Sequence, residues 1–135
     1  MRFFFAFVIA FFLFACGSGN KADQQLIGQW KFAHVDASAV PGYSGDPESR
    51  MHVSIMEAAM QEMTYEFSAD KSFVFQMPSG HGTQIQKGHY EIIDGQSLRM
   101  TKTAGESKTM TIEKVTADSL VLEENGVRMF FGRKQ

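Results

Sequence analysis

The stretch TYEFSADKSFVFQM at residues 64–77 contains two short segments in which apolar and polar residues alternate. Successive side chains of a β-strand point to opposite faces, so Tyr65, Phe67, Phe73, Phe75 and Met77 fall on one face. The residues between the two segments, 68–71, favour a turn. The stretch therefore predicts two antiparallel strands joined by a tight hairpin.

The same pattern continues toward the end of the chain. Alternating segments at residues 83–93, 97–103, 108–115, 120–123 and 127–131 are separated by short turns. Two of these turns are Asp-Gly and Asn-Gly pairs, which are strong hairpin signals. With a first strand at residues 26–34 the count is eight, and an eight-stranded meander removes its edges by closing on itself. The sequence predicts a mostly β fold, an eight-stranded antiparallel up-and-down barrel.

The one long connection, residues 35–62, is expected to place a helix between the first two strands. Asp46 suits the N-cap, Pro47 the first helical position and Glu48 the positive end of the helix dipole. At about 100° per residue, one side of this helix is mainly apolar and the other is polar. We expect the apolar side to lie across the barrel mouth or against its flank. That side contains His52, Ile55, Met56, Ala59, Met60 and Met63, with Arg50, Ser54, Glu57 and Gln61 opposite.

Residues 26–135 are expected to form a single domain, because their number suits one core and no composition shift marks a second. The chain is slightly acidic, with 13 Lys and Arg against 15 Asp and Glu. A nucleic-acid-binding surface needs a basic excess or a basic stripe. Nucleic acid is therefore not an expected partner.

The first 15 residues are predicted to be a signal peptide. Arg2 precedes an unbroken apolar run at residues 3–14. This run is shorter than the roughly 18 to 20 residues that a membrane-spanning helix needs, and it is typical of an export signal. Residues 16–25 are mainly small and polar, which indicates a flexible tether between the signal and the domain.

Cys16 is the only Cys in the chain. The segment at residues 13–16 is similar to the lipobox of bacterial lipoproteins, in which the Cys carries the lipid. An ordinary cleavage site that leaves a free thiol is the alternative. The resemblance implies a protein of the bacterial cell envelope that is anchored to a membrane through lipid on Cys16. Gly17 after the Cys points, by enterobacterial sorting rules, to the outer membrane.

A Gly-x-Trp motif at Gly28 and Trp30, on the first strand, resembles the signature of lipocalins. Residues 88–95, the Thr-x-Asp turn at 116–118 and Arg133 extend the similarity to the small lipocalin-like lipoproteins of Bacteroidota. The resemblance covers nearly the whole mature chain and implies that Arg133 covers the Trp30 ring at a closed barrel end. The helix in the first connection departs from lipocalins and is more like the lid of fatty-acid-binding proteins.

An eight-stranded barrel is either filled by its own side chains or holds one small ligand. The resemblance favours a small apolar ligand in the barrel interior and beneath the helix. A filled barrel that serves as a non-enzymatic interaction module of an envelope assembly is the alternative, with a protein partner that the sequence does not identify. The candidate lining residues are Tyr65, Phe67, Phe73, Phe75, Tyr90, Met56 and Met60.

A less favoured alternative is a copper site on the helix. His52, Met56, Met60 and Met63 share one predicted helix face, and imidazole and thioether groups can hold Cu(I). Met stripes at helical spacing are more often adaptable core filler. The other His residues show no metal-ligand spacing, and no nucleophile motif is present. We therefore expect no enzymatic activity and no cofactor.

Overall fold

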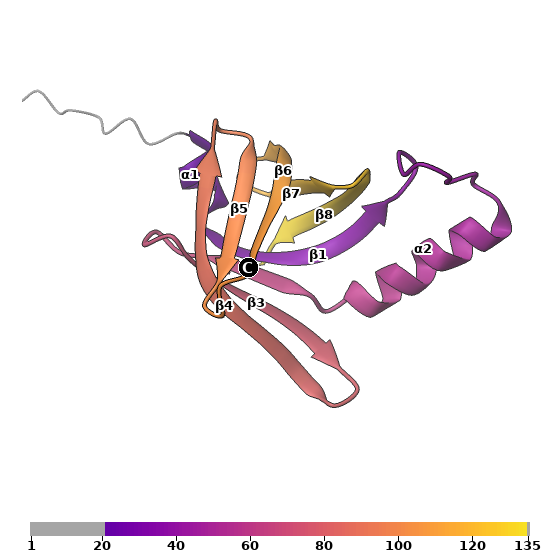
Figure 1. The fold of residues 1–135 in the computed structure, drawn as a ribbon, viewed down its shortest axis with the longest axis horizontal. Helices are drawn as coiled ribbons and strands as arrows, with labels where there is room; N and C mark the ends of the chain where they lie inside the picture. The colour runs from indigo at the N-terminus through magenta and orange to yellow at the C-terminus, as the bar shows by residue number, and fades with distance from the viewer. Residues whose placement is uncertain (1–20, 135) are drawn as a thin grey trace, which may run out of the picture.

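The computed structural model describes residues 21–134, which form two helices and eight strands. The strands pair in chain order and β8 pairs with β1, so the sheet closes into an antiparallel barrel (Figure 1). The predicted eight-stranded barrel, with a helix between its first two strands, is confirmed. The elements are α1 (Lys21–Leu26), β1 (Gly28–Asp36), α2 (Pro47–Met60), β2 (Thr64–Phe67), β3 (Ser72–Ser79), β4 (Gly82–Ile93), β5 (Ser97–Lys102), β6 (Ser107–Val115), β7 (Ser119–Glu124) and β8 (Val127–Arg133).

The hairpin turns are tight, as the sequence predicts. Asp94 and Asn125 have φ values of 54° and 53°, and the Gly that follows each of them also has a positive φ. Two consecutive residues with positive φ allow the turn to match the right-handed twist of the flanking strands. These turns connect β4 to β5 and β7 to β8 as antiparallel neighbours.

Alternation along the strands separates the core from the surface. In β2, Tyr65 and Phe67 are buried and Glu66 is exposed, and in β8 Met129 and Phe131 are buried. The inward side chains form one continuous apolar cluster. Removing this apolar surface from water is the main driving force for closing the barrel.

The antiparallel topology gives the barrel two different ends. At one end, which we call the closed end, β1 begins, β8 stops and α1 packs. At the other end, which we call the mouth, the long β1–β2 connection carries α2. Figure 1 shows α1 at one end and α2 projecting from the other.

The β3–β4 hairpin extends beyond the barrel wall at the mouth (Figure 1). β3 pairs with β2 only as far as Gln76, and β4 pairs with β5 only from Gly88 onward. Alternation places the end of this strand at Met77, before the turn residues that begin at Pro78, but β3 continues to Ser79. Pro78 lies where β3 no longer pairs with β2, and a strand edge tolerates the missing N–H of proline.

The N-terminus of α2 forms as predicted. Asp46 is the N-cap with extended backbone, and its carboxylate accepts a hydrogen bond of 2.7 Å from the backbone N–H of Ser49. Pro47 occupies the first helical position, where no N–H is needed. None of the residues of α2 is buried. The helix is therefore a partly exposed element attached to the mouth.

The predicted apolar face of α2 is partly wrong. Met56 and Met60 pack against the barrel core as expected, together with Val53. His52 is exposed, however, and the side chain of Ile55 is 59% exposed. The helix is thus turned so that Val53 takes part in the contact and Ile55 faces away from it.

A hydrogen bond to β1 explains this orientation of α2. β1 pairs with β2 only as far as Lys31, so the later residues of β1 need other partners on that side. The side chain of Glu57, predicted to lie on the polar side, accepts a hydrogen bond of 2.9 Å from the backbone N–H of Val35. A buried N–H without a partner is costly, and Glu57 removes that cost.

The end of the predicted tether is helical rather than flexible. Residues 21–25 belong to α1, and Leu26, predicted to begin the first strand, ends this helix and is fully buried. α1 is held by contacts distant in sequence, such as the ion pair of 2.8 Å between Asp23 and Lys71. The predicted signal peptide and Cys16 lie outside the described residues.

Candidate functional site

A cavity of about 350 Å³ opens at the mouth between β2, β3, β4, β5 and β6. We call it the mouth cavity. Its inner wall is made of aromatic and thioether side chains, and its rim is polar. The lining residues are Tyr65, Phe73, Phe75, Gln86, Met100, Lys102, Glu106, Ser107 and Lys108.

The aromatic wall is positioned by strand register. Tyr65 on β2 is directly opposite Phe75 on β3, and their ring centroids are 4.9 Å apart. The Tyr65 ring also contacts Phe67 at 5.6 Å and Phe131 at 5.5 Å. Contacts on three sides fix the ring in one orientation, because aromatic pairs at such distances favour defined geometries.

The hydroxyl group of Tyr65 has no hydrogen-bond partner among the described residues, although only 7% of this residue is exposed. Every fully buried side-chain nitrogen or oxygen in this part of the protein does have a partner. The Tyr65 hydroxyl is therefore not fully enclosed, and Tyr65 is one of the residues that line the mouth cavity. Burial, and secondarily the charge of Glu124, raises the pKa of Tyr65 well above its usual value. The group therefore stays protonated and can donate a hydrogen bond.

The charged groups of the rim are paired with each other. The ammonium group of Lys102 lies 3.0 Å from the carboxylate of Glu106, and that of Lys108 lies 2.8 Å from Glu124. The Ser107 hydroxyl is 2.9 Å from the hydroxyl of Thr101. The amide of Gln86 forms no side-chain hydrogen bond with the described residues. Gln86 and Tyr65 are thus the polar groups of the cavity that remain free.

The closed end has a different construction. The guanidinium carbon of Arg133 lies 4.2 Å from the centre of the Trp30 ring, as the resemblance implied. Arg133 also donates hydrogen bonds to the carbonyl oxygens of Gln25 and Ile27, at 2.7 and 2.8 Å, and to that of Ala117. A cation is favourable here because the carbonyls of Gln25 and Ile27 belong to or directly follow the C-terminal turn of α1, whereas that of Ala117 lies in the β6–β7 turn.

Trp30 and Gly28 complete the closed end. The indole N–H of Trp30 donates a hydrogen bond of 2.8 Å to the carbonyl oxygen of Leu26, and the side chain is fully buried. Gly28 has a φ of +136°, and a Cβ at this position would overlap the Nη1 atom of Arg133. The Gly-x-Trp motif therefore works here by making room for an arginine.

The structure brings together only part of the predicted lining set. Tyr65, Phe73 and Phe75 line the mouth cavity. Phe67 and Tyr90 are buried in the core toward the closed end, where the Tyr90 hydroxyl donates a hydrogen bond of 2.8 Å to the carbonyl oxygen of Ser68. Met60 packs against the core, and Met56 also lines a separate groove beside α2.

Sequence reasoning missed Gln86, Met100 and Lys102 in the cavity wall. Alternation could have found them, since Gln86 shares the inward phase of Tyr90 and Met100 shares that of Leu98. Polar residues at inward positions near a strand end are a useful signal, because a filled core rarely leaves them unpaired.

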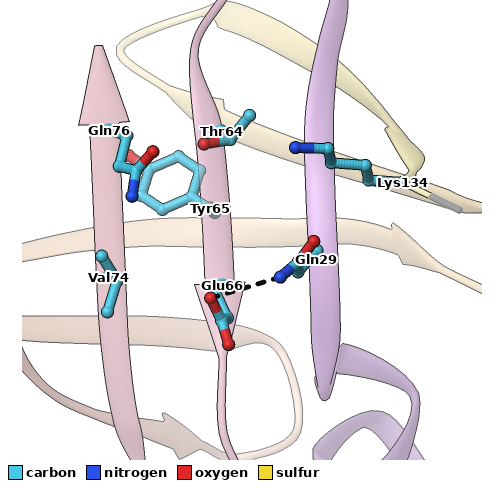
Figure 2. A pocket seen from close by; sticks show the side chains of 7 residues that line it. All are labelled: Gln29, Thr64, Tyr65, Glu66, Val74, Gln76 and Lys134. Carbon is cyan, nitrogen blue, oxygen red and sulfur yellow. Dashed lines mark hydrogen bonds between the residues drawn. The ribbon is translucent and has the colours of Figure 1, made fainter. Parts of the chain in front are cut away.

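Two other hollows are less suited to an apolar ligand. A smaller one of about 150 Å³ lies on the outer wall across β1, β2 and β3. Figure 2 shows its polar side chains, with Gln29 bonded to Glu66 at 3.4 Å. Tyr65 lies behind this surface (Figure 2). The groove beside α2 holds about 450 Å³ but is wide open to solvent.

The predicted copper ligands do not share one helix face. Met63 lies beyond Met60, the last residue of α2, and is buried, whereas His52 is exposed. Within residues 21–134, no group of three or more His, Cys, Asp and Glu side chains is placed to hold a metal ion. In the same part of the chain, neither helix is long and apolar enough to cross a bilayer.

Comparisons with known proteins agree with this geometry. The sequence model of the family described as "Lipocalin-like domain" matches residues 26–122. Three solved structures from Bacteroides are similar in fold. An uncharacterized protein from Bacteroides eggerthii has 14% sequence identity and a TM-score of 0.56, and the match covers 81% of this chain and 99% of that one. A lipocalin-like protein from Bacteroides uniformis has 16% identity, a TM-score of 0.55 and coverage of 82% of this chain and 99% of that one, and a DUF4847 family protein from Bacteroides vulgatus has 14% identity, a TM-score of 0.53 and coverage of 79% and 92%, respectively. No curated protein matches the chain.

Proposed function

The chain belongs to the family of lipocalin-like domains, and from that premise we propose that its mouth cavity binds a small, mainly apolar ligand. We further propose that lipid on Cys16 holds this binding domain at a membrane of the bacterial cell envelope, with the outer membrane as the expected location. The role is one of binding and not of catalysis.

The free hydroxyl of Tyr65 is the observation that carries the binding proposal. It is a protonated donor, it has no partner among the described residues, and Tyr65 lines a cavity with aromatic walls. Leaving a donor unpaired in such a place is unfavourable unless water or a ligand completes it. An apolar ligand with one polar group would pack against the aromatic walls and accept a hydrogen bond from the hydroxyl.

The size and lining of the cavity support the same function. Small-molecule sites usually have volumes of roughly 300 to 1,000 Å³, with apolar walls and a few polar groups that fix orientation. The mouth cavity, at about 350 Å³, fits the lower part of this range. Its ligand is therefore expected to be small, and no residue of α2 lines this cavity.

Binding can be tested with N-phenyl-1-naphthylamine, a neutral probe whose fluorescence rises in apolar surroundings. Gln86→Trp fills the mouth cavity and should weaken probe binding by about tenfold or more, since one residue of this size removes much of the space. Gln84→Trp is the matched control, because Gln84 lies on the same side of β4, two residues farther along the projecting hairpin, and does not line the cavity. Equal binding by both variants would contradict the site.

Lipid attachment is tested separately. Cys16→Ser should abolish labelling by a radioactive fatty acid and release the protein from membranes, because the sequence offers no other thiol. A Cys16→Ser protein that stays acylated would refute the anchor and leave the binding site untouched.

An interaction module is the second candidate. Met51 and Ile55 on the outer side of α2 are 55% and 59% exposed, and exposed apolar side chains of this size favour contact with another protein. If the wild-type domain takes up no apolar probe and native mass spectrometry shows no retained ligand, this second function becomes the preferred one.

A further inference from the structure

The polar groups around the mouth cavity differ in whether they are already satisfied. The Tyr65 hydroxyl and the Gln86 amide are uncharged and have no hydrogen-bond partner in the described part of the chain. The two cations of the rim, Lys102 and Lys108, each have an acidic partner within 3.0 Å. The groups left over for a ligand are therefore neutral ones.

The charges at the rim also cancel as a set. Lys102 and Lys108 face Glu106 and Glu124, so two positive charges meet two negative ones. A ligand carboxylate that enters an apolar cavity loses its hydration. The free-energy cost of this loss is offset only where the cavity contains a cation that is not already paired with a protein carboxylate. The residues that line the mouth cavity offer no such cation.

Glu124 adds a second obstacle to an anion. Burial is the larger cause of the raised pKa of Tyr65, and the negative charge of Glu124 raises this pKa further. A carboxylate that accepted the hydrogen of Tyr65 would therefore meet repulsion from Glu124. A neutral acceptor would gain the same hydrogen bond without that repulsion.

We infer that the ligand of the mouth cavity is a neutral amphiphile, an apolar body with one uncharged acceptor such as a hydroxyl, ketone or ester oxygen, and not a carboxylic acid. This inference rests on the proposed binding function. Tyr65 donates to the acceptor, Gln86 offers a second contact, and the ion pairs of the rim stay intact.

The test uses 1-decanol and decanoate as competitors of N-phenyl-1-naphthylamine at neutral pH, below the concentration at which decanoate forms micelles. The two compounds differ only at the polar end. Decanol should displace the probe at a concentration about tenfold lower, a ratio that a single good hydrogen bond without opposing repulsion can supply. Tighter binding of decanoate would overturn the inference while leaving the binding function in place.

Two variants examine the cause of the preference. Tyr65→Phe removes the donor and should weaken decanol by about five- to tenfold, while Tyr43→Phe makes the same chemical change outside the cavity and should leave it unaltered. Glu124→Gln frees Lys108 and should strengthen decanoate binding by about tenfold. Glu91→Gln breaks a comparable ion pair of 2.8 Å with Arg99, away from the cavity, and serves as its control.

The outcomes separate the two proposals. If neither competitor displaces the probe and the probe itself does not bind, the binding function fails. If decanol binds more tightly but Glu124→Gln leaves decanoate unchanged, the charge explanation is wrong and the inference falls. If both variants behave as expected, the neutral ligand class is supported.

Discussion

The two ends of this barrel use polar groups in opposite ways. At the closed end, Arg133 donates to three carbonyl oxygens and covers the Trp30 ring, which in turn donates to a fourth carbonyl. At the mouth, the Tyr65 hydroxyl and the Gln86 amide have no partner among the described residues. Paired polar groups stabilise a fold, whereas unpaired ones at a cavity prepare it for a ligand. Substitutions at the closed end should therefore change stability, and those at the mouth should change binding.

The largest effect is expected from Trp30→Ala. This change empties the centre of the closed end and removes the ring beneath Arg133, and aromatic-to-alanine changes in cores cost about 3 to 5 kcal/mol. The free energy of unfolding in urea measures the loss. A variant that unfolds at the wild-type urea concentration but no longer binds the probe would reverse the roles that we assign to the two ends.

Gly28→Ala should have the next largest effect. The added Cβ would overlap the Arg133 guanidinium, and φ at +136° is a strained conformation for alanine. Strain of this kind costs about 1 to 3 kcal/mol. Thermal unfolding checks the effect, with Gly80→Ala as control because nothing lies near a Cβ at that position. Equal loss in both variants would show that the space for Arg133 is unimportant.

Two tyrosine variants sharpen the comparison between the ends. The Tyr90 hydroxyl donates to the Ser68 carbonyl near the closed end, so Tyr90→Phe should cost about 1 to 2 kcal/mol by leaving that acceptor unpaired. Tyr65→Phe should change stability by less than about 0.5 kcal/mol, since its hydroxyl has no partner to lose. Urea unfolding of both variants gives the difference. A larger loss for Tyr65→Phe would mean that its hydroxyl is satisfied within the fold.

The smallest effects concern two aspartates at opposite ends. Hydrogen bonds from the Ser49 backbone and then the Ser49 side chain lower the pKa of Asp46, and those from the Ser72 side chain and then its backbone lower that of Asp70. A lowered pKa means that the stabilisation is complete above the unfolded value, about 3.8, and is lost as the pH falls through the folded one. NMR titration of the serine amides measures both values.

Amide exchange measured during these titrations compares how far each aspartate stabilises its own surroundings at the two ends of the barrel. Protonation of Asp46 should speed amide exchange in the first turn of α2, and protonation of Asp70 should affect only the β2–β3 turn. Unaltered exchange in α2 below the pKa of Asp46 would show that the N-cap does not hold this helix.

The barrel could be predicted because its signals are local. Alternation with period two and turn pairs such as Asp94-Gly95 act over a few residues, and they fix the neighbours of each strand. α1 could not be predicted, since its six residues are mostly polar. Its position depends on Asp23 pairing with Lys71 and on Arg133 binding the carbonyls of Gln25 within the helix and Ile27 just after it.

The candidate site was only partly predictable for a similar reason. A helical projection assigns faces to α2 from its own sequence, but Glu57 turns toward the barrel because it accepts a hydrogen bond from the Val35 N–H, which β2 does not pair. Inward direction could be derived for Tyr65, Phe73 and Phe75, yet Phe67 and Tyr90 point inward as well. What separates the two groups is depth along the barrel axis, and alternation carries no information about depth.

Together with the proposed lipid on Cys16, the position of α1 at the closed end would decide from which side a ligand reaches the mouth cavity. Cys16 stands five residues before Lys21, and five extended residues span at most roughly 18 Å. With the proposed lipid on Cys16, the closed end remains next to the leaflet that holds the lipid, and the mouth can open toward the aqueous compartment or an opposing surface. A ligand would then enter from the aqueous compartment or the opposing surface, and the leaflet that holds the lipid would anchor the domain without supplying the ligand.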